Sequence, residues 1–258
     1  MIDIIPPSLS AGETIRYRLP RRLIAGILWS VVALRPRSFA CDARAALAGL
    51  RPSLEVLGGE NVPAHGPILV ACNHYSRPGF DAWWLALAIS AAVAARRAPD
   101  ADLEVRWVMT AAWTFPESRW KRCHLMPVTK RIFRRIACVY GFVPMPAMPP
   151  DPDEAAERAQ AVLETLRLAR RGASIGLAPE GRDTPDRLGE PPEGVGRFIA
   201  LLVGAGLSVL PVGVTERGGR LRVSFGPSFI PQIPPERGEQ DRLVAQQVMS
   251  AIALCIPV

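Results

Sequence analysis

The chain has 258 residues, of which 49% are hydrophobic and 21% charged, and this composition excludes a mainly disordered chain. The length suffices for one domain with a substantial core or for two small ones. The formal net charge of +7 favours an anionic membrane, an acidic substrate or nucleic acid as a partner, without choosing among them.

The first element in chain order is an apolar segment near the N-terminus. Residues 21–34, RRLIAGILWSVVAL, predict a short helix that is apolar almost all round. It is either buried in the core or lies in a membrane interface, with Trp29 and the flanking arginines at headgroup level. Its apolar run is shorter than the ~18–20 residues that span a bilayer. We assign residues 1–50 to this N-terminal helical segment, which the second interpretation places at a membrane interface.

Strand-like and helical segments alternate along the rest of the chain. Apolar runs bounded by turn residues predict strands at residues 54–57, 68–72, 105–109, 138–145, 174–177, 208–214 and 221–225. Longer apolar or amphipathic stretches predict helices at residues 81–97, 119–135, 153–171, 194–205 and 236–255. The alternation predicts an α/β fold with a single mixed, largely parallel sheet covered by helices. We expect residues 51–258 to form this one structural unit.

The five cysteines are scattered along the chain and contain no C-x-x-C pair. An odd and dispersed set argues against a disulfide framework and against a zinc site. We therefore expect no metal and a reducing, cytoplasmic environment.

The strongest candidate for chemistry is Asn73-His74, directly after the strand expected at residues 68–72. A strand end that opens into a helix is where α/β folds place reactive groups, and histidine takes up a proton most readily near neutral pH. Asp81 follows at the expected start of the next helix. It would either orient the imidazole or act only as a helix cap, and the pair alone is a weak signal.

A second candidate is the turn Pro179-Glu180-Gly181-Arg182, after the strand expected at residues 174–177. Arg182 would bind a phosphate through paired N–H donors, and Gly181 would let a ligand approach the backbone. The alternative is a surface turn whose Glu–Arg pair contributes little.

A third pattern, G-x-S-x-G at residues 172–176, matches the nucleophile turn of lipid esterases and related hydrolases. That turn needs a strand before the serine and a helix after it. Here a helix is expected before Ser174 and a strand after it, so we interpret the match as accidental.

Residues 119–135 combine basic side chains with interleaved aromatic residues. This combination suits an anionic bilayer surface or an acidic ligand, although a run of charge is more often a solvated helix face. No helix-turn-helix, zinc finger or ribonucleoprotein motif supports nucleic acid. The residues that we assign to a membrane surface are Arg119, Lys121, Arg122, Lys130, Arg131, Arg134 and Arg135.

Together these segments resemble the glycerolipid acyltransferases of the lysophosphatidic-acid acyltransferase type. Residues 54–76, LEVLGGENVPAHGPILVACNHYS, resemble the first block of that family, in which a G-x-E-N-x-P lead runs into a strand and then N-H. Residues 179–182 resemble the third block, F-P-E-G-T-R-S, and residues 207–212 the fourth, an apolar strand that ends in proline. Residues 141–143 stand where the second block falls. The resemblance covers roughly residues 50 to 230.

Three departures from the family pattern indicate a divergent member. Six residues separate His74 from Asp81, where the family has four. Pro144-Met145-Pro146 replaces the acid and arginine of the second block, and Arg182 follows Gly181 directly. These changes indicate either a different acceptor or a member that has lost activity.

The resemblance implies an enzyme that moves a fatty acyl group from an acyl thioester, on coenzyme A or an acyl carrier protein, to a hydroxyl of a lysophospholipid or related lipid. It implies that His74 is the general base, that Asp81 orients it, and that Glu180, Gly181 and Arg182 shape the acceptor site, with no bound cofactor. The expected partners are the lipid acceptor, the thioester donor and an anionic membrane surface at the inner face of the membrane, and not nucleic acid. The alternative is a non-catalytic lipid- or membrane-binding module on the same fold.

Overall fold

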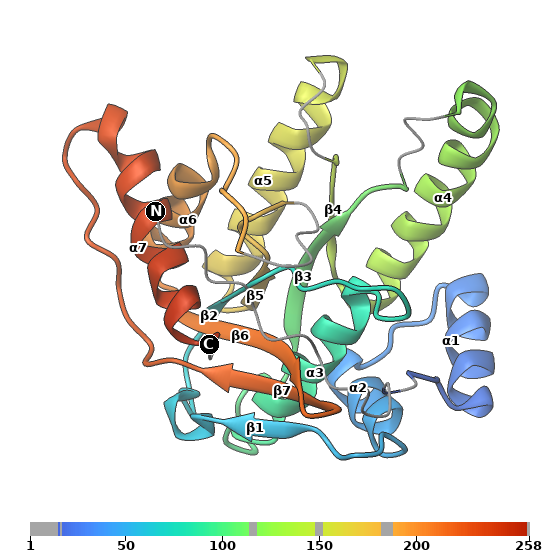
Figure 1. Ribbon diagram of the computed structural model, residues 1–258. Coiled ribbons are helices and arrows are strands. Elements are labelled where there is room, and N and C mark those ends of the chain that lie inside the picture. Colours follow the sequence, from blue (N-terminus) through green and yellow to red (C-terminus); the bar gives the residue numbers. More distant parts are fainter. Residues whose placement is uncertain (1–14, 16, 114–117, 148–151, 182–187, 257–258) are drawn as a thin grey trace, which may run out of the picture.

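The structure is a computed structural model that describes residues 15, 17–113, 118–147, 152–181 and 188–256. Its centre is a seven-stranded sheet in the order β1-β7-β6-β2-β5-β3-β4 (Figure 1). All neighbouring strands pair parallel except β6 and β7, which pair antiparallel. The predicted α/β fold with a mixed, largely parallel sheet is therefore confirmed. The strands are β1 (Glu55–Leu57), β2 (Ile68–Cys72), β3 (Val105–Thr110), β4 (Val143–Met145), β5 (Ser174–Leu177), β6 (Ser208–Arg217) and β7 (Arg220–Phe225).

Helices cover both faces of the sheet. One core contains residues of α2 and α3, with contributions from α1 and the end of α4, and the other contains residues of α5, α6 and α7. In Figure 1, α6 and α7 lie on one side of the molecule and α1 on the other. The helices are α1 (Arg21–Ala33), α2 (Phe39–Leu47), α3 (Ala82–Ala94), α4 (Arg119–Tyr140), α5 (Ala155–Arg170), α6 (Val195–Gly204) and α7 (Arg237–Leu254), with 3-10 turns at Gly59–Asn61 and Pro152–Glu154.

Strand β2 lies in the middle of the sheet, and all five of its residues are buried. Ile68, Val70 and Cys72 belong to the core beneath α2 and α3, whereas Leu69 and Ala71 belong to the core beneath α6 and α7. An uninterrupted apolar run is what a strand covered on both faces requires. The strand predicted at residues 68–72 is therefore confirmed. Asn73 and His74 directly follow its carboxyl end.

The strand predicted at residues 138–145 is wrong over its first half. Helix α4 continues to Tyr140, and only Val143–Met145 form a strand. Val139 and Tyr140 are buried in the core from their helical positions. Gly141 then ends the helix with φ of 68°, a backbone conformation that glycine adopts without steric cost.

The segment that contains α1 and α2 is joined to the rest of the molecule by polar contacts. The Asp42 carboxylate on α2 accepts hydrogen bonds from Arg37 and, at 2.7 Å, from the Tyr140 hydroxyl at the end of α4. Glu104 accepts the backbone N–H groups of Phe39 and Ala40 at the start of α2. These contacts satisfy helix-end donors that would otherwise lack partners.

Candidate active site

The site begins where β2 ends. The Asn73 side chain donates to the carbonyl oxygen of Val214 at 3.0 Å and accepts the Val214 N–H at 2.7 Å. A buried amide with both of its functions bonded to one backbone residue fixes the end of β2 against β6. His74, the next residue, therefore leaves the sheet from a fixed point.

The backbone of His74 is held from the other neighbouring strand. Its N–H donates at 2.6 Å to Oε1 of Glu180, which follows β5. The Glu180 side chain is almost fully buried, and its Oε2 accepts the Gly189 N–H at 2.5 Å. Sequence reasoning predicted Glu180 as a substrate-binding residue. These two contacts give Glu180 a structural role. Its buried carboxylate joins the backbone of His74, at the end of β2, to the backbone of Gly189.

Gly181 follows Glu180 in a tight turn, in which its N–H donates to the carbonyl oxygen of Ala178 at 3.1 Å. Its φ of 65° lies in the region that favours glycine, and the residue is exposed. Its predicted role in acceptor binding stays a prediction. Arg182 lies outside the described residues.

Asp81 occupies the N-cap position of α3, as the sequence predicted, and it is exposed. Its side chain makes no cap hydrogen bond, so the expected bond from a backbone N–H is absent. Among the described residues, no hydrogen bond joins the Asp81 carboxylate to the His74 ring. The predicted role of Asp81 in orienting His74 therefore stays a prediction, because catalytic hydrogen bonds are often long without ligand.

The two additional residues between His74 and Asp81 form a turn. Phe80 N–H donates to the carbonyl oxygen of Arg77 at 2.9 Å, and Gly79 has φ of 84°. Proline at the second position and a positive-φ glycine at the third are the features of a type II turn. Pro78 and Gly79 are exposed, so the additional length projects from the loop and the chain returns to begin α3 at Asp81.

Two other nucleophilic side chains near these segments do not suit the chemistry. Burial raises the pKa of the Cys72 thiol, with a smaller effect from the charge of Glu180, so a reactive thiolate is disfavoured. Ser174 is buried at the start of β5, where its hydroxyl accepts the Ile68 N–H at 3.3 Å. Because β2 and β5 run parallel, Ser174 lies beside the start of β2, on the order of 15–20 Å along the strand from His74. The reversed context of G-x-S-x-G is confirmed.

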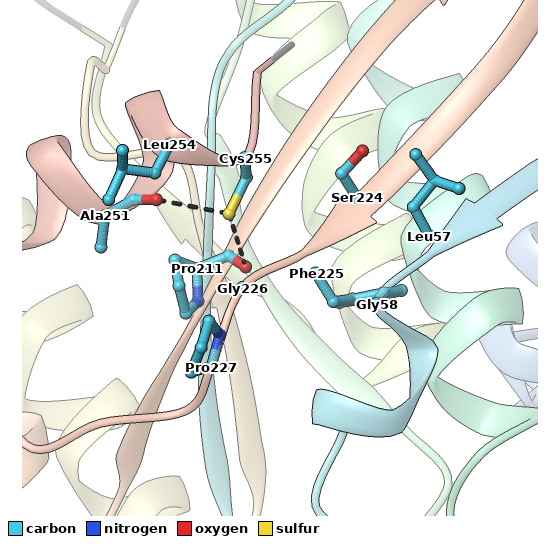
Figure 2. A pocket seen from close by; sticks show the side chains of 10 residues that line it. All are labelled: Leu57, Gly58, Pro211, Ser224, Phe225, Gly226, Pro227, Ala251, Leu254 and Cys255. Atoms are coloured by element: carbon cyan, nitrogen blue, oxygen red, sulfur yellow. Dashed lines mark hydrogen bonds between the residues drawn. The ribbon is translucent and has the colours of Figure 1, made fainter.

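A cavity of about 400 Å³ lies elsewhere, between the end of α7 and strands β6 and β7 (Figure 2). Its walls are mostly apolar and include Leu57, Pro211, Phe225 and Leu254. None of the predicted site residues that the structure describes lines it. The cavity is therefore distinct from the surface around His74.

Several of the basic residues predicted for a membrane surface contact other parts of the protein. Lys130 pairs with Glu157 at 2.7 Å, and Arg134 lies 3.8 Å from the same carboxylate. Arg135 donates to the carbonyl oxygens of Val31 and Val32 at the end of α1. The Glu157 carboxylate therefore offsets part of the positive charge of α4, and the Arg135 guanidinium is directed at α1.

The side chains of two more of these residues, Arg119 and Arg122, lie outside the described part. Lys121 is exposed, and its backbone N–H donates to the N-cap Ser118. Arg131 is exposed on α4.

Helices α1 and α4 both expose large apolar side chains. On α1, Leu28, Trp29 and Val32 are 60%, 60% and 68% exposed, although Leu23 on the same helix is buried. The buried-helix interpretation of residues 21–34 therefore holds for one face only. On α4 the exposed apolar residues are Trp120, Leu125, Val128 and Ile132. Within the described ranges, no helix is both long enough and apolar enough to cross a bilayer.

The comparisons with known proteins agree with this arrangement. The family model described as Acyltransferase matches residues 53–215, a range that contains β2, His74 and Glu180. The chain belongs to the acyltransferase family, which confirms the family inferred from the sequence blocks. No curated protein matches the chain in sequence.

One solved structure with the same fold is the 1-acyl-sn-glycerophosphate (LPA) acyltransferase PlsC from Thermotoga maritima. Its TM-score is 0.51 and its sequence identity 16%, over 92% of this chain and 83% of that one. At this identity the similarity establishes a shared fold. The departures in the His–Asp loop and the second block make this chain a divergent member.

Proposed function

We propose that the protein transfers a fatty acyl group from an acyl thioester to a hydroxyl of a lysophospholipid or a related lipid. The observation that carries the proposal is the position of His74. It follows the central strand, it is half-buried, and its backbone is held between Asn73 and the buried Glu180. A general base needs such a fixed position to reach its proton.

In the proposed reaction, the His74 imidazole takes the proton of the acceptor hydroxyl as its oxygen attacks the thioester carbonyl. The tetrahedral intermediate collapses, the C–S bond breaks, and the leaving sulfur receives the proton from the imidazolium. The products are an ester and a free thiol on coenzyme A or the acyl carrier protein, and no acyl-enzyme forms. Asp81 stabilises the imidazolium when substrate is bound.

The remaining assignments follow from the same proposal. Glu180, Gly181 and Arg182 shape the acceptor site, and Arg182 contacts a phosphate or another polar headgroup of the acceptor. The proton transfers need a histidine and a carboxylate alone, so the proposed reaction uses neither a metal nor a bound cofactor.

We also propose that the enzyme works at the inner face of a membrane, where acceptor and product reside. The exposed apolar residues of α1 and α4 support this proposal more strongly than the basic residues do. A surface helix that exposes Leu28, Trp29 and Val32 loses unfavourable contact with water when its outer face enters an interface. Arg131 and the other basic residues of α4 add attraction to anionic lipid.

The test combines purified protein with labelled acyl-CoA or acyl carrier protein and a panel of lysophospholipid and glycolipid acceptors. We expect ester formation with at least one pair, and its loss in His74→Ala. A folded His74→Ala protein that transfers at the wild-type rate would overturn the assignment of the base.

A second candidate is a non-catalytic lipid-binding module, favoured by the lack of a hydrogen bond between Asp81 and His74. It predicts that lipid vesicles bind but that no ester forms with any donor and acceptor pair. The same assay, read beside vesicle binding, separates the two functions.

A further inference from the structure

A carboxylate from a distant strand holds the middle of the loop between His74 and Asp81. Arg77 donates from Nε and from Nη2 to the two carboxylate oxygens of Glu216, the second bond being 2.6 Å long. Glu216 lies near the end of β6, and its side chain is 10% exposed. A paired guanidinium–carboxylate contact fixes orientation as well as distance.

Two tyrosines complete the set of donors around this carboxylate. The Tyr75 hydroxyl donates to Oε2 of Glu216 at 3.0 Å, and the Tyr17 hydroxyl donates to Oε1 at 2.7 Å. Tyr75 directly follows His74, so the contact lies one residue from the proposed base. Glu216 therefore binds the loop at two points and ties it to the segment that precedes α1.

The aromatic rings extend this contact to the start of α3. The Tyr17 ring packs edge-on against Phe80 at 4.9 Å and tilted against Trp84 at 5.2 Å. Phe80 is buried and directly precedes Asp81, and Tyr75 also packs against it at 5.4 Å. The cluster thus contacts both ends of the loop.

We infer that Glu216 is a positioning residue for acyl transfer, which holds the His74–Asp81 loop in its working geometry through Arg77 and Tyr75. The catalytic part of this inference rests on the proposed function. Its physical basis is that a loop with two additional residues has more conformations to lose. A buried contact at its middle removes that freedom before substrate binds.

The kinetic test uses Arg77→Lys, which keeps the charge but loses the paired geometry, and Glu216→Gln, which loses the charge. We expect kcat to fall by about tenfold to a hundredfold, because small displacements of a catalytic group are costly. KM for the acyl thioester should stay near the wild-type value, since Arg77 and Glu216 are directed at each other. A change confined to folding stability would contradict the inference.

The matched control is Arg222→Lys. Arg222 on β7 makes the same kind of contact to Glu55 on β1, with Nε and Nη2 at 3.0 Å and 2.9 Å from one oxygen. This pair is also partly buried. Arg222 pairs with Thr215, the residue before Glu216 on β6, but successive side chains of a strand point to opposite faces, so Arg222 lies on the other face of the sheet from Glu216. We expect Arg222→Lys to leave kcat unchanged.

A second measurement is independent of activity. The chain has three histidines, so nitrogen-15-labelled imidazoles give three sets of NMR signals, and His74→Asn assigns one of them. In Arg77→Lys we expect the His74 signals to shift or broaden, while His65 and His124 stay in place. In Arg222→Lys all three should match the wild type.

The outcomes separate the inference from the function on which it rests. Unchanged His74 signals in a folded Arg77→Lys protein would overturn the positioning role, whatever the activity. Shifted signals in a protein without transferase activity would support the positioning of His74 and reject acyl transfer. If Glu216→Gln does not fold, the kcat and the His74 signals of Arg77→Lys alone test the positioning role.

Discussion

The backbone N–H of His74 and the buried carboxylate of Glu180 are joined by a 2.6 Å hydrogen bond. This contact connects the end of β2 to the turn that follows β5, two segments 106 positions apart in the chain. The proposed base and the turn assigned to the acceptor are therefore joined directly by a buried contact.

The first prediction concerns Glu180→Gln, in which an NH₂ group replaces one of the two accepting oxygens. Either His74 or Gly189 then directs its N–H at another donor. We expect the free energy of unfolding to fall by about 1–3 kcal/mol, measured by urea denaturation, with a loss of kcat in the folded protein. Wild-type stability together with wild-type kcat would contradict this account of Glu180.

The second prediction pairs His74→Ala with Ser174→Ala. Loss of a general base should reduce the transfer rate by about 10²–10⁴ with little effect on the fold. Ser174→Ala should instead cost about 1 kcal/mol of stability, because the Ile68 N–H loses its acceptor, and it should leave transfer intact. Transfer assays and thermal unfolding on both variants give the two readouts, and the reverse result would favour an esterase built on Ser174.

The third prediction is that Asp81→Asn lowers the transfer rate sharply. Asparagine caps helices as well as aspartate, and the Asp81 side chain makes no cap bond here. We therefore expect stability within about 0.5 kcal/mol of the wild type. A near-wild-type rate would reject the His74–Asp81 dyad.

The fourth prediction is that the protein binds anionic vesicles and that binding weakens with salt. Each basic residue near the surface contributes about 1 kcal/mol of attraction, and salt screens this attraction. Leu28→Glu should reduce binding at every salt concentration, because it places a charge on the outer face of α1. The control is Leu163→Glu on α5, a leucine 54% exposed on the other side of the sheet. Co-sedimentation measures all three proteins, and equal loss in both variants would argue against α1 as the contact.

The fifth prediction concerns acid stability. Burial would raise the pKa of Glu216, but hydrogen bonds from Arg77 and Tyr17 outweigh that effect and lower it. A lowered folded pKa stabilises the fold above the unfolded value of ~4.3 and loses that contribution as the pH falls through the folded value. Wild-type stability should therefore decline more steeply below about pH 4 than that of Glu216→Gln. Urea denaturation measures both proteins. If their free energies of unfolding decline in parallel as the pH falls, the Arg77–Glu216 pair contributes nothing to stability.

The sequence predicted most elements because their hydrophobic patterns are local. The uninterrupted apolar run at residues 68–72 identified β2 without error. The end of α4 was missed because Val139 and Tyr140 are common strand formers, and only Gly141 indicates where the helix stops. That glycine could have corrected the boundary, since glycine is frequent just after helix ends.

The contacts of the site were less accessible to sequence reasoning. In the sequence, Glu216 follows the apolar run at residues 208–214 and resembles any surface carboxylate. Its contact with Arg77 depends on the pairing of β2 with β6, which brings together residues 139 positions apart. The same holds for Glu180, whose family motif suggested substrate binding but whose contacts with backbone N–H groups are visible only once β2 and β5 are neighbours.

The turn at Pro78-Gly79 also bears on how such a loop evolves. Residues that project between two anchored positions can be gained or lost without displacing the positions themselves, so the spacing of the motif can drift while its chemistry is conserved.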